Sequence, residues 1–139
     1  MAKYIIDTNI FISALWNKRA RKVIEKILKE KDKILMCKEI LDEYKLIINR
    51  LFDKNIIGNN EKKKLKGLFK KILNNSKIVK VIKKVELCRD SKDDIFLSLA
   101  LQEKAHYIVT GDKDLIEIDK ELLLKAGMKK LKIIRIAEV

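Results

Sequence analysis

The chain has 139 residues, of which 47% are hydrophobic and 38% are charged, a composition that supports a folded domain and excludes a disordered chain. Lysine and arginine number 33 against 20 aspartates and glutamates, so the net charge of +13 suggests an anionic partner, with nucleic acid the first candidate. A lysine-rich surface without such a partner is the alternative that charge alone leaves open.

The cysteines and the histidine exclude whole classes of site and compartment. Cys37 and Cys88 form no Cys-x-x-Cys pair, and His106 is the only histidine, so a zinc site of Cys and His ligands is nearly excluded. This cysteine usage fits a reducing cytoplasm. Asp7 interrupts the first apolar run, and no run reaches the roughly 18 apolar residues of a membrane span. We therefore expect a cytoplasmic protein with no signal peptide and no membrane helix.

Short apolar runs alternate along the chain with longer helical patterns. Strands are expected at residues 4–6, 34–37, 78–82, 107–109 and 133–136. Helices are expected at 11–29, in one or two pieces, and at 39–52, 61–73 and 93–103. Because proline is absent and no linker or repeat divides the chain, we predict one domain over residues 1–139. The alternation predicts an α/β fold whose mainly parallel sheet is covered by helices on both faces.

Two aspartates follow expected strands closely. Asp7 comes directly after the first strand, and Asp112 follows the fourth strand after Thr110 and Gly111. Ligand sites in parallel sheets form beyond the carboxyl ends of the strands, so we expect both carboxylates at one site. Either aspartate alone could merely cap the next helix, but two acids at equivalent strand ends favour a shared site.

Glu43 flanks the apolar face of its expected helix. It follows Ile40 by three residues and precedes Ile47 by four, whereas Asp42 points toward solvent. A carboxylate at the margin of a core needs a cation, a hydrogen-bond donor or a raised pKa. On spacing alone, a glutamate paired with one of the many lysines is the more common arrangement.

An acidic run precedes the expected helix at 93–103. Ser91 and Asp94 fit a capping box, Ser-x-x-Asp, which gives Asp94 a structural role. Asp93 shares a helix face with Leu97 and Ala100 at i, i+4 and i+7 spacing. We therefore expect Asp93 to point inward, near the end of the sheet.

Acids that converge without histidine or cysteine form an all-oxygen site. Carboxylates a few ångströms apart cannot all stay ionised without a counter-cation, and hard oxygen ligands suit Mg²⁺ or Mn²⁺. One or two such ions can lower the pKa of a bound water and stabilise the leaving oxygen of a phosphodiester. This chemistry needs no side-chain nucleophile, so a chain with one histidine can still be an enzyme.

Four segments carry these acids, namely residues 4–11 (YIIDTNIF), 39–44 (EILDEY), 88–97 (CRDSKDDIFL) and 107–115 (YIVTGDKDL). In this order, and over nearly the whole chain, they resemble the PIN domain family. More narrowly they resemble the toxin ribonucleases of bacterial and archaeal toxin–antitoxin pairs. The resemblance implies a three-layer α/β/α fold with a five-stranded parallel sheet, and RNA cleavage that depends on Mg²⁺ or Mn²⁺. It also implies a homodimer and a cognate antitoxin that covers the cleft.

The resemblance also implies a role for individual residues. The catalytic and metal-binding acids are Asp7, Glu43, Asp93 and Asp112. Asp94 is the alternative to Asp93 in register. The supporting residues are Asn9, Thr110, Asp94 and Asp114, with Asn9 and Thr110 acting through hydrogen bonds.

The sequence leaves other functions open. PIN domains also serve as RNA-processing nucleases, and the same fold could be a non-catalytic RNA-binding module. A phosphatase of the haloacid-dehalogenase type would need a second aspartate at position 9, where Asn9 stands. One expected helix is strongly basic, and its candidate contacts with RNA phosphates are Lys62, Lys63, Lys66 and Lys70. A solvated helix face is the alternative interpretation of these lysines.

Overall fold

Five parallel strands form the sheet of the computed structural model, which describes residues 2–30 and 33–139. The strands are β1 (Lys3–Ile6), β2 (Lys33–Met36), β3 (Ser76–Ile78), β4 (Tyr107–Val109) and β5 (Lys132–Ile134). Their spatial order is β3-β2-β1-β4-β5, and every neighbouring pair is parallel. The central strands are the most deeply buried, as parallel strands covered on both faces should be.

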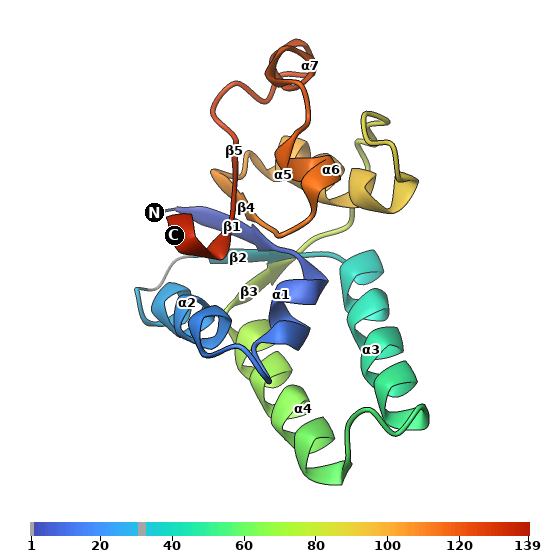
Figure 1. The fold of residues 1–139 in the computed structure, drawn as a ribbon. Helices are drawn as coiled ribbons and strands as arrows, with labels where there is room; N and C mark the ends of the chain where they lie inside the picture. The colour runs from blue at the N-terminus through green and yellow to red at the C-terminus, as the bar shows by residue number, and fades with distance from the viewer. Residues whose placement is uncertain (1, 31–32) are drawn as a thin grey trace.

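Helices connect the strands and cover both faces of the sheet (Figure 1). They are α1 (Thr8–Ser13), α2 (Lys18–Lys29), α3 (Lys38–Asp53), α4 (Asn59–Asn74), α5 (Asp94–Glu103), α6 (Lys113–Ile116) and α7 (Lys120–Lys125), with short 3₁₀ turns at η1 (Ser91–Asp93) and η2 (Ile136–Glu138). In Figure 1, α1 to α4 lie below the sheet and α5 to α7 lie above it. The α/β fold predicted from the alternating pattern is therefore confirmed, including its five parallel strands.

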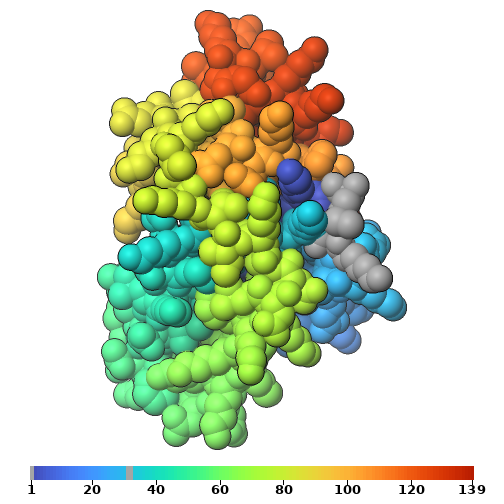
Figure 2. All heavy atoms as spheres, turned by 180° about the vertical axis from the view of Figure 1, so that it is seen from behind, coloured from blue at the N-terminus to red at the C-terminus, as the bar shows by residue number. Residues whose placement is uncertain are grey.

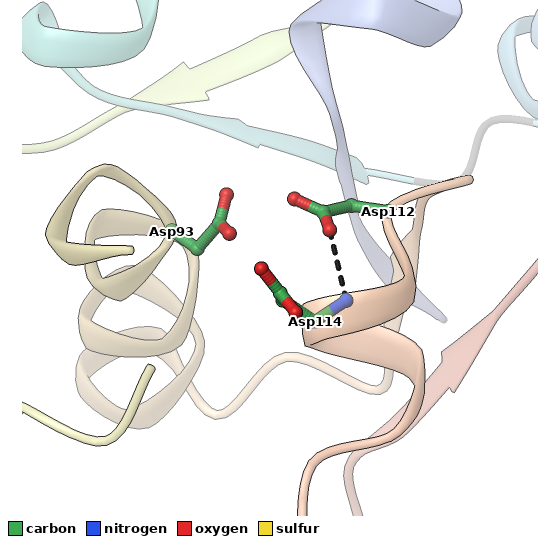
Figure 3. A group of neighbouring side chains, drawn as sticks. All are labelled: Asp93, Asp112 and Asp114. Carbon is green, nitrogen blue, oxygen red and sulfur yellow. Dashed lines mark hydrogen bonds between the residues drawn. The ribbon is translucent and has the colours of Figure 1, made fainter. Parts of the chain in front are cut away.

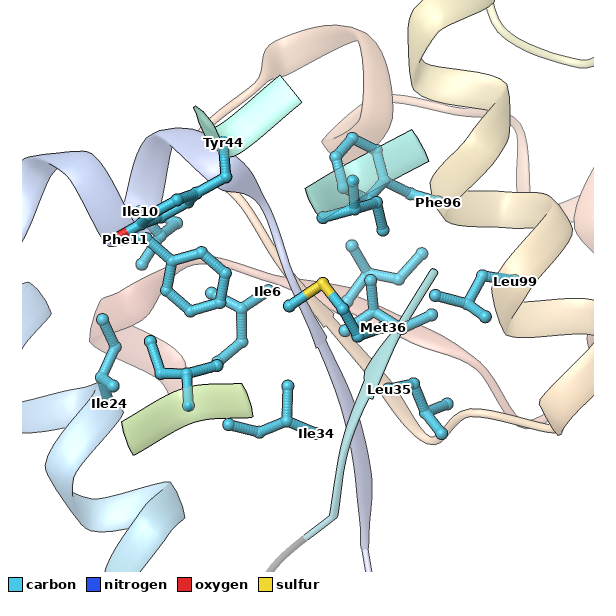
Figure 4. Packing of buried hydrophobic residues seen from close by; sticks show 14 of the residues in the cluster. Ile6, Ile10, Phe11, Ile24, Ile34, Leu35, Met36, Tyr44, Phe96 and Leu99 are labelled. Atoms are coloured by element: carbon cyan, nitrogen blue, oxygen red, sulfur yellow. The ribbon is translucent and has the colours of Figure 1, made fainter. Parts of the chain in front are cut away.

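An aromatic cluster anchors α3 beneath the sheet (Figure 4). The Tyr44 ring is fully buried and stacks on Phe69 of α4, with 4.0 Å between ring centroids. It also meets the edge of Phe11 of α1, at 5.5 Å. Burial of three aromatic rings in one cluster fixes α3 against α1 and α4. Glu43, the residue before Tyr44, is thereby held close to the end of β1.

The order of the strands marks the region between β1 and β4 as the expected ligand position, which we call the crevice. From β1 the chain proceeds to β2 and β3 on one side, and then returns to β4 on the other side of β1. Connections on opposite sides leave a gap beyond the carboxyl ends of the two central strands, where ligands of open α/β sheets bind. Asp7 stands at the end of β1, and Thr110 to Asp112 stand at the end of β4.

The third strand differs from the prediction. Residues 78–82 were expected to be extended in the sheet, but β3 spans Ser76–Ile78 and only the Val79 N–H still bonds to Met36 of β2. Beyond it, the side chain of Gln102 on α5 binds the backbone of Lys80, Ile82 and Lys83 instead. A side-chain amide thus replaces a strand neighbour, which an apolar pattern does not reveal.

The ends of several helices also differ from the prediction. The pattern at 11–29 forms two helices, and the second begins where the Asn17 side chain accepts from the backbone N–H groups of Arg19 and Ala20. The predicted strand at 133–136 ends at Ile134, and Ile136 begins η2. Helices α6 and α7 were not predicted, because four and six residues are too few to show helical periodicity.

Candidate active site

Asp7 is held at the end of β1 by three hydrogen bonds. Its backbone N–H donates to Val109 of β4 at 2.9 Å, which continues the sheet by one residue. Its carboxylate caps α1 by accepting from the Asn9 N–H at 3.1 Å, and its other oxygen accepts from the Thr110 hydroxyl at 2.7 Å. The side chain is only 5% exposed, and this burial is the main reason why its pKa is raised. The two hydrogen bonds to the carboxylate act in the opposite direction.

Asp112 is connected to Asp7 through Thr110. The Asp112 N–H donates to the Thr110 hydroxyl oxygen at 3.0 Å, and that hydroxyl donates to Asp7. One carboxylate oxygen of Asp112 caps α6 by accepting from the Asp114 N–H at 2.9 Å. Asp7 and Asp112 therefore both cap a helix. Capping uses only one oxygen of Asp112, and in Figure 3 its other oxygen points toward Asp93.

Asp93 lies opposite Asp112, at the junction of η1 and α5 (Figure 3). Carboxylate oxygens of Asp93, Asp112 and Asp114 lie within 4.8 Å of one another. The Asp93 side chain is 8% exposed, and its pKa is raised to about 7. Burial is the largest cause, followed by hydrogen bonding to the Asp112 side chain and by the negative charges of Asp112, Asp90 and Asp7. This is the behaviour of carboxylates that are crowded together without a counter-cation.

Glu43 approaches the same crevice from α3. The side chain is half-buried, and its pKa is raised by burial first and then by the charge of Asp7. Lys92 on η1 lowers it, and Asp90 raises it. The Thr8 hydroxyl lies near enough to Glu43 to lower its pKa. This hydroxyl is fully buried, yet it forms no hydrogen bond of standard geometry with any described residue.

Asp94 has a structural role, but the predicted capping box with Ser91 is wrong. One Asp94 oxygen accepts from the backbone N–H groups of Leu87 and Cys88, at 2.9 and 2.7 Å. The turn at η1 is capped instead by Asp90, whose side chain accepts from the Lys92 N–H. The sequence pattern misses this arrangement because Asp94 binds an upstream extended segment rather than its own first turn. With one oxygen bound in this way, Asp94 is less available than Asp93 as a ligand.

The remaining predicted residues lie at the rim or away from the crevice. Asn9 donates its backbone N–H to the Asp7 carboxylate, and its side chain is exposed. Lys63, Lys66 and Lys70 are exposed on α4, while the Lys62 ammonium sits 4.2 Å from the centroid of the Phe52 ring. The basic helix therefore belongs to the lower layer in Figure 1, whereas Asp93 and Asp112 belong to the upper elements.

Sequence reasoning missed Thr8 and Lys92. Thr8 directly follows Asp7 and opens α1, so a hydroxyl beside a strand-end acid was the available signal. Lys92 is a lone cation between Asp90 and Asp93, and its approach to Glu43 depends on the folding of α3 against η1. Local sequence gives no sign of that contact.

The side chains that converge here fit a hard divalent cation. Every donor is an oxygen, which suits Mg²⁺ or Mn²⁺ and not a soft metal. Three of the carboxyls have raised pKa values, and the buried Thr8 hydroxyl lacks a partner within the described residues. A cation would offset the crowded negative charge, and a hydroxyl or its bound water could complete an oxygen shell.

Residues 3–114 match the PIN domain family, and the chain belongs to it. This match includes the four segments on which the resemblance was based, except for residue 115 at the end of the last one. PIN domains are typically nucleases that use divalent metal ions, which agrees with the acidic cluster.

Two individual proteins are similar over most of their length. The uncharacterized protein MJ1680 of Methanocaldococcus jannaschii is 35% identical over 137 residues, which cover 94% of this chain and 84% of that protein. A chain in the crystal structure of VapBC2 from Rickettsia felis, bound to a DNA fragment from their promoter, has a similar fold with a TM-score of 0.58. That likeness covers 94% of this chain and 98% of the other, at 16% identity. Within the described ranges, no helix is both long and apolar enough to cross a membrane.

Proposed function

We propose that this protein is an endoribonuclease that depends on Mg²⁺ or Mn²⁺ and hydrolyses RNA phosphodiester bonds at Asp7, Glu43, Asp93 and Asp112. The observation that carries the proposal is the cluster of carboxylate oxygens from Asp93, Asp112 and Asp114 in a PIN domain, with Asp7 near enough to raise the pKa of both Asp93 and Glu43. The net charge of +13 favours a polyanionic substrate, although the crevice itself is acidic.

The protein's carboxylates would act mainly by binding a metal ion in a fixed position. Asp7, Asp93 and Asp112 present buried or partly buried oxygens on fixed elements, so little reorganisation is needed to bind an ion. When bound, the ion supplies positive charge that favours attack by water and stabilises the leaving oxygen. Thr110 orients Asp7 and positions the backbone of Asp112, while Glu43 lies close enough to Asp7 for their charges to interact. Because the pKa of Asp93 is raised to about 7, its carboxyl must lose a proton before it can act as an anionic ligand.

We further propose that the protein is the toxin of a toxin–antitoxin pair. The similarity in fold to a VapBC2 chain supports this assignment, and a cognate antitoxin would cover the acidic crevice. A homodimer in the cytoplasm is part of the same proposal. The alternative of a PIN nuclease in RNA processing would predict no neighbouring gene for an antitoxin.

RNA cleavage with and without divalent ions tests the proposed activity. The purified protein should cut single-stranded RNA in Mg²⁺ or Mn²⁺, should lose the activity in excess chelator, and should regain it when Mn²⁺ is restored. Undiminished cleavage in chelator would contradict metal dependence. Hydrolysis of small phosphomonoesters in place of RNA would instead support a phosphatase.

Replacement of Thr110 by valine should lower metal affinity and activity without changing the space that the side chain occupies. Valine matches threonine in shape, but it removes the hydrogen bond to Asp7 and the acceptor for the Asp112 N–H. Loss of a group that orients a metal ligand commonly costs 10–100-fold in metal affinity or activity, and we expect a decrease of roughly that size. Ser13→Ala is the control, because the Ser13 hydroxyl donates only to Ile10 in its own helix. Equal Mn²⁺ affinity and equal cleavage in wild type and Thr110→Val would show that the hydrogen bonds do not support the site.

A further inference from the structure

Residues 82–92 lie along α5 and include the first two residues of η1, and we call them the basic strap. The strap lies between the edge strand β3 and Asp93, and Figure 2 shows it in yellow on the surface of the molecule. Three polar side chains of α5 hold its backbone. Gln102 accepts from the N–H groups of Ile82 and Lys83, Ser98 accepts from the Val85 N–H at 3.0 Å, and Asp94 accepts from the N–H groups of Leu87 and Cys88.

The three tethers form a regular ladder. Asp94, Ser98 and Gln102 are spaced four residues apart, so they occupy one face of α5 over about 12 Å of helix. The strap is bound in the reverse order, so it runs antiparallel to α5 with its carboxyl end beside Asp93. Side-chain tethers at three levels order a segment that has no strand neighbour of its own, which lowers the entropic cost of presenting its side chains to a ligand.

The side chains that this ladder displays are mainly cationic. The exposed basic groups of the strap are Lys83, Lys84, Arg89 and Lys92, and its exposed acids are Glu86 and Asp90. Within the described part of the chain, the four basic groups form no ion pair, whereas the nearby Lys77 is paired with Glu103 at 3.0 Å. The row ends at the site, because Lys92 lowers the pKa of Glu43.

We infer that the basic strap binds the phosphate backbone of single-stranded RNA and leads it into the carboxylate crevice. The inference rests on the proposed ribonuclease function and adds the path of the substrate. An acidic crevice repels a polyanion, so a fixed row of cations that reaches its rim supplies the attraction that the crevice lacks. The basic helix α4 is more strongly charged, but it belongs to the opposite layer of the fold from α5 and the strap.

Salt-dependent RNA binding tests this inference. In an Asp7→Asn background, which prevents cleavage, anisotropy of a fluorescein-labelled single-stranded RNA is measured over a range of salt. Lys83→Gln, Lys84→Gln and Lys92→Gln together should weaken binding at least tenfold at low salt and reduce the slope of log K against log salt by about 2, as expected for three contacts to a single strand. Lys63→Gln, Lys66→Gln and Lys70→Gln on α4 form the control, with the same change in charge. An equal loss in both triple variants, or none in the strap variant, would overturn the inference.

A second variant separates the effect of an ordered strap from the effect of its positive charge. Ser98→Ala with Gln102→Ala removes two tethers and keeps every cation, so it should weaken RNA binding several-fold and speed hydrogen exchange at the Val85 amide. Unchanged RNA affinity with faster exchange would show that the ladder has no part in binding. The failure of the ribonuclease proposal is distinguishable, because a wild-type protein that binds RNA through the strap but never cleaves it would refute the activity alone.

Discussion

Asp7→Asn should reduce RNA cleavage by at least about a hundredfold, since even residues that only orient a metal ligand commonly contribute 10–100-fold. Asparagine keeps the shape of Asp7 and can still cap α1 through its amide oxygen. It removes the negative charge that a divalent ion would require, and it disrupts the acceptor for the Thr110 hydroxyl. The measurement is the initial rate of RNA cleavage in Mn²⁺ at neutral pH.

Asp42→Asn is the matched control for this experiment. Asp42 neighbours Glu43 in sequence, but its side chain is exposed on α3. The same chemical change there should leave cleavage within twofold of wild type. Full activity of Asp7→Asn in protein free of wild-type contamination would refute the assignment of the active site.

Asp93→Asn should also reduce cleavage strongly, but it should stabilise the protein when metal is absent. The raised pKa of Asp93 means that the carboxylate form is disfavoured in the folded protein by burial and by neighbouring acids. Asparagine carries no charge and can still donate a hydrogen bond to Asp112. In chelator at pH 8, we expect a gain of about 1–2 kcal/mol in the free energy of unfolding, a value reduced because solvent screens part of the repulsion.

The pH dependence of this gain has a definite sign. The raised pKa of Asp93 keeps a proton on its carboxyl up to about pH 7 in the folded protein, whereas the unfolded chain releases it near the ordinary aspartate pKa of 3.8. The unfolded state therefore binds fewer protons between these values, and wild-type stability falls relative to Asp93→Asn as pH rises through this window. Urea unfolding in chelator at pH 5 and pH 8 measures the difference. A variant that is less stable than wild type at pH 8 would show that the crowded charge is not destabilising.

Divalent ions should make wild type more stable than Asp93→Asn, which is the reverse of the order expected in chelator. An ion binds the ionised form of Asp93, so Mn²⁺ should raise the melting temperature of wild type more at pH 8 than at pH 6. The variant lacks that carboxylate and should gain much less. The exposed Asp53→Asn on α3 serves as the control and should follow wild type at both pH values.

The layers of the fold could be predicted from the sequence, but the course of residues 79–92 could not. Apolar runs mark β1, β2 and β4 because these strands are buried on both faces, and helical spacing marks α3, α4 and α5. The segment after β3 is apolar in pattern as well. Its position is decided by Ser98 and Gln102, which lie far along the chain, and a single sequence does not reveal such tethers.

The candidate site could be predicted in part. Asp7 and Asp112 follow from strand ends, and the inward direction of Asp93 follows from its helical spacing with Leu97 and Ala100, all three of which are buried. The sequence presented helix capping and a site role as alternatives for Asp7 and Asp112, whereas each residue caps a helix and also lies at the candidate site. It also did not show the hydrogen bonding between the Asp93 and Asp112 side chains, because that depends on the packing of η1 against the start of α6.

Calorimetric titration of Mn²⁺ into metal-free protein at pH 8 tests the central claim most directly. The claim is that these carboxylates form a divalent metal site on which RNA cleavage depends. We predict saturable binding to wild type, and binding to Asp7→Asn that is weaker by at least about a hundredfold. Equal affinity in the two proteins, or no binding to a wild-type protein that still cleaves RNA, would contradict it.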